Sequence, residues 1–159
     1  MNSMMREYYP TFEMYQALRD QLMEILTDED LLFRPGDRNE LLGELCREIG
    51  ETERSYIQSF KTFTQDFSYR NEEPELARSV GMLVAWFREL DQELKSTIEA
   101  LSEKDLQNRV VDRGGGFILP IHIQLDVYKE ALLIFCGKVS VYLKALGKSR
   151  PEQWQEWIG

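Results

Sequence analysis

Histidine is nearly absent from this chain of 159 residues, which contains one histidine, His122, and two cysteines, Cys46 and Cys136. The cysteines lack the Cys-x-x-Cys spacing of redox and zinc motifs, so we expect two reduced, buried thiols. The single histidine has no suitable nucleophile near it, which leaves no Ser-His-Asp or Cys-His arrangement. The sequence therefore offers no standard residue set for nucleophilic catalysis.

Long apolar runs and basic clusters are also missing. The most apolar window, 131–136, falls far short of the roughly 20 apolar residues needed to cross a bilayer. The first residues include Arg6 and Glu7 and do not resemble a signal or transit peptide. A net charge of −9, from 28 acidic and 19 basic residues, repels phosphate backbones and anionic lipids. We therefore expect a soluble, cytoplasmic protein that binds neither nucleic acid nor membranes.

What the sequence does contain is helical periodicity along almost its whole length. Hydrophobic residues make up 43% and charged residues 30%, which is typical of one globular domain spanning 1–159. Apolar residues recur at helical spacing, and no strand-like alternation or internal repeat is found. The prediction is an all-α protein with helices at about 11–26, 38–63, 74–101 and 119–146 and a short helical tail at 151–158. Asp37 or Asn39 is expected to cap the second helix.

Two segments near the end of the chain have distinctive compositions. The predicted helix 119–146 is apolar over much of its circumference, which places it at the centre of a helix bundle. The preceding segment, 102–117, contains three consecutive glycines, Gly114 to Gly116, without the pattern of a phosphate-binding loop. We interpret 112–117 as a mobile loop that can act as a lid.

Three sequence patterns resemble motifs of one known family. The end of the last helix, CGKVSVYLKALG at 136–147, resembles the closing motif of the DinB/YfiT-like superfamily. ELCREIGETER at 44–54 is similar to its second-helix pattern, and LSEKDL at 101–106 is similar to its Leu-Ser-x-x-Asp-Leu connector. The resemblance implies an up-down-down-up four-helix bundle with a longer loop before the last helix.

The resemblance also implies a divalent metal held by three histidines, one on the second helix and two at i, i+4 on the last. The corresponding positions here hold Glu48, Ala131 and Phe135. Alanine and phenylalanine have no donor atom, so we expect the family metal site to be lost and no cofactor to be bound. His122 points away from Ala131, at roughly 100° per residue, and is no substitute ligand.

Glu48 is the only vestigial metal position that retains a polar side chain. It lies between Leu45 and Thr52 in the helical stripe, so it faces the bundle interior or its edge. We favour a Glu48 at the rim that is solvated or ion-paired, and a pair with Lys138 inside the site is the alternative hypothesis. The candidate pocket residues are Thr52, Lys138, Tyr128 and Trp86.

Three functions follow from these features. The first is a small-ligand-binding or interaction protein in which apolar packing has replaced the metal centre. The second is a DinB-like hydrolase or thiol-dependent transferase with a diverged active site. The third is a homodimeric scaffold in which Trp86, beside the core residue Phe87, lies at the interface. The missing metal ligands weigh against the enzyme.

Overall fold

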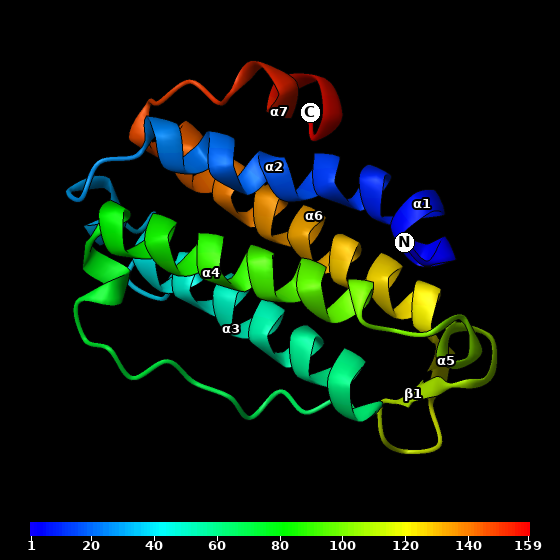
Figure 1. Cartoon of the computed structure of the whole chain (residues 1–159). Helices are drawn as coiled ribbons and strands as arrows, with labels where there is room; N and C mark the ends of the chain where they lie inside the picture. Colours follow the sequence, from blue (N-terminus) through cyan, green and yellow to red (C-terminus); the bar gives the residue numbers. More distant parts are fainter.

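The structure, a computed structural model that describes all residues from Met1 to Gly159, is a bundle of four long helices. The four are α2 (Tyr9–Ile25), α3 (Leu42–Thr62), α4 (Val80–Glu99) and α6 (Ile121–Leu146). They run antiparallel or parallel to one another along one axis (Figure 1). None of them is both long enough and apolar enough to cross a membrane.

The topology of the bundle is up-down-down-up, as the family resemblance implies. Helices α2 and α6 run in one direction, and α3 and α4 run in the other (Figure 1). Each helix has two neighbours, in the order α2, α4, α3, α6 around the bundle. Because α3 and α4 are parallel, the segment 63–79 must return along the whole length of the molecule, and it does so on the outside of α3 (Figure 1).

Several predicted boundaries are wrong by a few residues, and side-chain caps explain the clearest case. The third long helix begins at Val80 rather than at 74, because the Ser79 hydroxyl accepts the Met82 N–H at 3.2 Å and caps it there. Residues Leu76–Arg78 form a separate 3₁₀ turn, η2. The N-cap position of the second long helix is Leu41, which has no capping side chain, rather than Asp37 or Asn39.

The first helical region also differs from the prediction, because it starts earlier and is divided. A short helix, α1 (Ser3–Glu7), precedes α2, and the Asn2 side chain caps it by accepting the Met5 N–H at 2.9 Å. After α2, residues Asp30–Leu32 form the 3₁₀ turn η1. The Asn2 amide also donates to the Ile98 carbonyl at 2.7 Å, which ties the N-terminus to the end of α4.

The segment before α6 is more ordered than the sequence indicated. It contains α5 (Glu103–Asn108), which starts with a capping box between Ser102 and Asp105. It also contains strands β1 (Val110–Asp112) and β2 (Ile118–Pro120), paired antiparallel, so the expectation of no strand is wrong. Gly114 to Gly116 form the hairpin loop, and all three have positive φ, which glycine adopts without strain.

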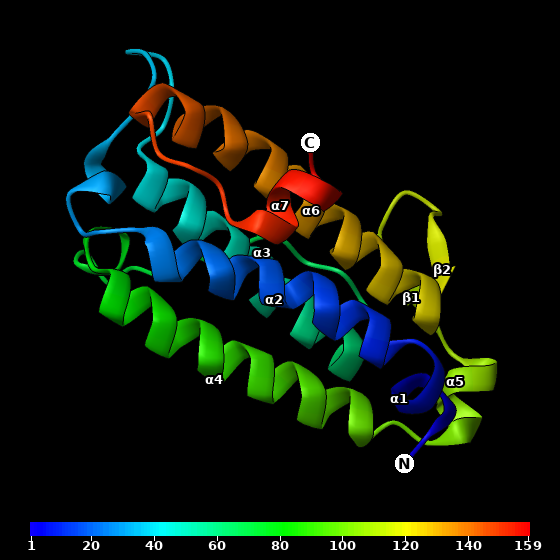
Figure 2. The ribbon, with the colours of Figure 1, turned by 90° about the horizontal axis from the view of Figure 1, so that it is seen from above.

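The last long helix occupies a corner of the bundle and not its centre. Helix α6 packs against α2 and α3 and leaves its remaining side uncovered (Figure 2). Its surplus apolar residues are therefore at the surface, where Ile134 is 60% and Val141 59% exposed. The short α7 (Glu152–Trp157) folds back over the bundle, and the buried Trp154 indole donates to the Leu18 carbonyl at 2.9 Å.

Candidate functional site

A small cavity lies between α3 and α6, at the positions that the family resemblance assigns to metal ligands. Its volume is about 150 Å³. The walls are mostly apolar, and one carboxylate and one ammonium group are the only charged groups among them. The lining residues are Leu45, Glu48, Ile49, Thr52, Ala131, Ile134, Phe135 and Lys138.

Helical spacing places these side chains together. On α3, Leu45, Glu48 and Thr52 follow one another at steps of three and four, so they share one face. On α6, Ala131, Phe135 and Lys138 do the same. Leu45, Ile49 and Phe135 are buried and form the base of the cavity, whereas Glu48 and Lys138 are exposed. Five of the residues that the sequence singled out thus line one cavity.

These residues do not fit a divalent metal. Ala131 and Phe135 carry no donor atom, and Glu48 is exposed to solvent. Nowhere in the chain do three histidine, cysteine, aspartate or glutamate side chains converge as metal ligands. One carboxylate oxygen pair is too small a ligand set for the tetrahedral or octahedral sites of divalent ions in proteins.

Glu48 and Lys138 line the same cavity from opposite helices without forming an ion pair. Every ion pair in the structure with an N···O distance within 4.0 Å involves other residues. Glu48 is exposed and lies at the rim of the cavity. Both charges are therefore free to meet a molecule that enters between the helices.

A second, larger groove of about 570 Å³ adjoins the cavity on the other side of Glu48. It lies between α3 and the returning segment 63–79, and Glu48 and Thr52 line both spaces. The Glu51 carboxylate accepts the Asn71 backbone N–H at 2.7 Å, which fastens the returning segment to α3. The charged residues of the groove are Glu40, Glu44, Arg47, Glu48, Glu51, Arg70 and Glu72. Acidic groups outnumber basic ones, so the groove attracts cations.

The sequence predicts Tyr128 and Trp86 as pocket residues, but neither side chain lines this cavity or the groove. Tyr128 is completely buried and stacks on Tyr56, with ring centroids 4.9 Å apart. Trp86 packs against Gly50 of α3, where an added Cβ would lie 2.3 Å from the indole Cζ3. Trp86 is therefore a core residue, and the proposed role at a dimer interface does not fit its position.

The remaining residues considered for chemistry are held in structural contacts. His122 stacks on Tyr8, with ring centroids 5.2 Å apart, and lines neither space. Cys46 and Cys136 are free and buried, and burial raises the pKa of each thiol to about 12. At neutral pH both are protonated, so neither supplies a thiolate nucleophile.

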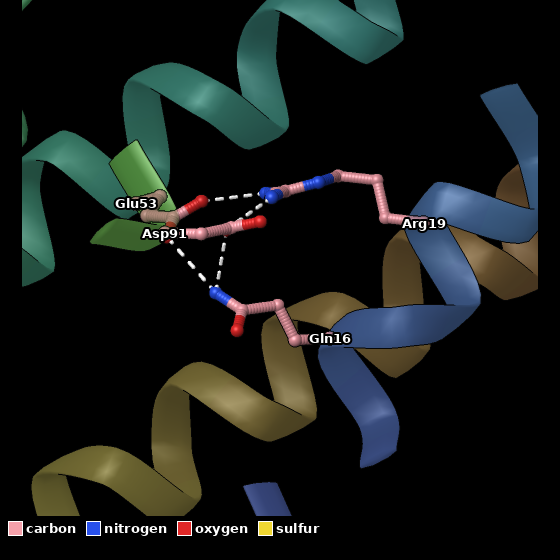
Figure 3. Close-up of polar contacts among 4 residues, drawn as sticks. All are labelled: Gln16, Arg19, Glu53 and Asp91. Atoms are coloured by element: carbon pink, nitrogen blue, oxygen red, sulfur yellow. Dashed lines mark hydrogen bonds and ion pairs between the residues drawn. The ribbon is translucent and has the colours of Figure 1, made fainter. Parts of the chain in front are cut away.

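Sequence reasoning missed a buried charged cluster in the centre of the bundle (Figure 3). The guanidinium of Arg19 on α2 donates to Glu53 of α3 at 2.5 Å and also to Asp91 of α4. The Gln16 amide donates to the same two carboxylates, at 3.1 and 2.6 Å. A signal was present, because each charged residue occupies an apolar stripe: Arg19 lies between Tyr15 and Leu22, Glu53 between Ile49 and Tyr56, and Asp91 between Phe87 and Leu94.

The cluster contains one cationic group and two carboxyl groups, so its net charge is negative when both carboxyl groups are ionised. Arg19 and Glu53 are completely buried, and the Asp91 side chain is 23% exposed. Burial and the neighbouring Glu53 raise the pKa of Asp91 to about 7, although Arg19 acts in the opposite direction. Asp91 also lines a groove between α2 and α4, so its carboxylate is the charged group of the cluster that is partly exposed to solvent.

Comparison with known proteins agrees with the bundle and its topology. A family model, described as the DinB superfamily, matches residues 11–125. A crystal structure of a DinB-like protein from Bacillus subtilis superposes with a TM-score of 0.66 and 16% identity over 87% of this chain and 90% of that one. A search of curated proteins finds no match. Because the family model matches most of the chain, this protein belongs to the DinB superfamily.

Proposed function

We propose that this chain is a metal-independent member of the superfamily that binds a small organic cation between α3 and α6. The observation that carries the proposal is the cavity of about 150 Å³ at the vestigial metal positions, which has apolar walls and a carboxylate at its rim. In this account the apolar part of the ligand fills the cavity, and its ammonium group pairs with Glu48.

The size and lining of the cavity define the apolar part of the ligand. A dry apolar cavity of roughly 150 Å³ is large enough for benzene. Leu45, Ile49 and Phe135 supply a surface without polar groups at the base. A six-carbon ring or a short branched chain is therefore the group that fits, and larger groups have to extend into the neighbouring groove.

The surrounding charges favour a cation over an anion. Glu48 belongs to both the cavity and the groove, and the groove adds four further glutamates against two arginines. Lys138 on the opposite rim is exposed and is not paired with Glu48. An approaching ammonium group meets a negative field along the α3 side, whereas a carboxylate of equal size is repelled there.

The proposal is tested with benzylamine and benzoate, two probes of similar shape and opposite charge. Chemical-shift titration of the isotope-labelled protein should show benzylamine shifting the amides around Ala131 and Phe135, with benzoate binding at least tenfold more weakly. Glu48→Gln should remove this preference, whereas Glu89→Gln, which changes an exposed carboxylate on α4, should leave it intact.

A second variant tests whether benzylamine binds in the cavity between α3 and α6. Ala131→Leu adds three carbons inside the cavity and should abolish benzylamine binding while the fold is kept, as judged by the spectrum of the free protein. Equal affinity for the two probes, or benzylamine binding unchanged in Ala131→Leu, would contradict the proposal.

A further inference from the structure

The uncovered side of α6 carries an ordered stripe of exposed residues. All exposed residues of the helix lie from Glu130 onward and on this side: Glu130, Ile134, Gly137, Lys138, Val141, Lys144 and Ala145. Glu130, Ile134, Gly137, Val141 and Lys144 follow one another at alternating steps of four and three, which is the spacing of a coiled-coil seam. Ile134 and Val141 are 60% and 59% exposed, so no part of this chain covers the seam.

Gly137 lies in the middle of this seam and has no role within the chain. Glycine inside a helix costs roughly 0.5–1 kcal/mol relative to alanine. A Cβ added at Gly137 would meet no atom within 4 Å, so internal packing does not require glycine here. Its backbone lacks the positive φ found at Gly114 to Gly116 and Gly147. What glycine does provide is room for another helix to approach closely.

We infer that a second copy of this chain docks on this face, with the two α6 helices antiparallel and crossing at Gly137. A two-fold axis at Gly137 places each residue opposite the one that lies equally far along the helix in the other direction. Glu130 then faces Lys144 of the second copy, and Ile134 faces the region of Val141. The face is thus complementary to itself in charge, and its apolar residues meet one another.

The order of the charged residues along this face favours an antiparallel second copy over other partners. A parallel copy would place Glu130 beside Glu130 and Lys144 beside Lys144, which is unfavourable at both ends. A negatively charged surface would be attracted by Lys138 and Lys144 but repelled by Glu130 and by the acidic groove beside α3. The antiparallel copy satisfies both ends of the seam.

The length of the seam indicates a weak dimer. From Glu130 to Lys144 the helix rises about 21 Å, so one pair of helices buries well under the roughly 800 Å² per partner of a standard interface. We expect a dissociation constant in the micromolar range or above. Ile134 and Lys138 also line the cavity between α3 and α6, so the second copy lies beside its mouth.

Disulfide crosslinking tests the geometry directly. A cysteine on the axis lies next to its own copy, so Gly137→Cys should form a covalent dimer rapidly under mild oxidation. Lys144→Cys should not, because the two copies of that position lie about 21 Å apart in the antiparallel arrangement. Gly81→Cys, on the exposed start of α4, measures chance collisions, and the buried native cysteines give no background. Crosslinking of Gly137→Cys no faster than Gly81→Cys, or equally fast for Lys144→Cys, would overturn the inference.

Sedimentation velocity at several hundred micromolar tests the energetics. Gly137→Arg should abolish association, and the matched Gly81→Arg should not. Glu130→Lys and Lys144→Glu should each weaken association by about tenfold, and the double charge swap should restore it. A wild-type protein that stays monomeric, or a double swap no better than the single variants, would contradict the docking. Neither result bears on benzylamine binding, so the two proposals fail separately.

Discussion

The guanidinium of Arg19 donates to the carboxylate of Glu53 at 2.5 Å, and both side chains are completely buried between α2 and α3. This ion pair connects α2 and α3, which lie diagonally opposite each other in the bundle. Asp91 extends the link to α4, and the Arg19 guanidinium stacks over the Phe87 ring with its Cζ 4.1 Å from the centroid. Polar contacts thus connect three of the four long helices at the core.

Removal of Arg19 is expected to cost far more stability than neutralisation of Glu53. Arg19→Met leaves two buried carboxylates without a cation, and we expect a loss of about 3–5 kcal/mol. Glu53→Gln keeps a hydrogen-bond acceptor for Arg19, which still pairs with Asp91, so we expect about 1–2 kcal/mol. Urea unfolding curves give both values. Equal losses in the two variants would show that charge balance in the cluster is unimportant.

Asp91 is expected to make folding depend on pH. Its pKa in the folded protein, about 7, lies above the ordinary value of 3.8, so the folded state binds the extra proton between those values. The stability it contributes is present below pH 4 and is lost as the pH rises through 7. The difference in unfolding free energy between wild type and Asp91→Asn should fall by roughly 2–4 kcal/mol from pH 4 to 8. A difference that is flat or rises with pH would contradict this account.

Two glycines in long helices should respond to alanine in opposite ways. Gly50→Ala forces a methyl group against Trp86, because the added Cβ would lie 2.3 Å from the indole, and should destabilise the fold by about 1–3 kcal/mol. Gly137→Ala adds a methyl group in open space and should stabilise the monomer by about 0.5–1 kcal/mol. Thermal unfolding at low micromolar concentration measures both. A stabilising Gly50→Ala would show that Trp86 does not pack on α3 as described.

Introducing histidines tests whether the positions that the family resemblance assigns to metal ligands converge. Ala131→His with Phe135→His places two imidazoles at i, i+4 on α6, facing Glu48 across the cavity. Zinc or nickel should raise the melting temperature of this double variant, and adding Glu48→Gln should weaken the effect. Ala131→His alone is the control and should show little response. No metal affinity in a folded double variant would mean that the corresponding positions on α6 were wrongly assigned.

The sequence predicted the number and order of the long helices because their apolar stripes are continuous. Helical spacing and the family resemblance also group Glu48, Thr52, Ala131, Phe135 and Lys138, and these five residues line one cavity in the structure. Prediction from the sequence failed at two local features, the start of α4 and the short β hairpin. Ser79 caps α4 although Pro74 suits a first turn, and β1 and β2 form in short segments without alternation.

The charged cluster was also missed. Arg19, Glu53 and Asp91 each lie in an apolar stripe, but only the packing of three helices brings them together. A single charged residue in a stripe usually lies at its edge, where its long side chain reaches water. The joint occurrence in three helices was the usable signal. The many apolar residues of α6 likewise predict a helix at the centre of the bundle, whereas Ile134 and Val141 are exposed.

The most direct test of a metal-independent site is elemental analysis of untagged protein, followed by zinc titration monitored by thermal unfolding. Because Ala131 and Phe135 offer no donor atom in the cavity, we predict no stoichiometric metal after purification and no zinc-dependent change in melting temperature. Stoichiometric metal that raises the melting temperature in the wild type and is lost in Glu48→Gln would contradict the account.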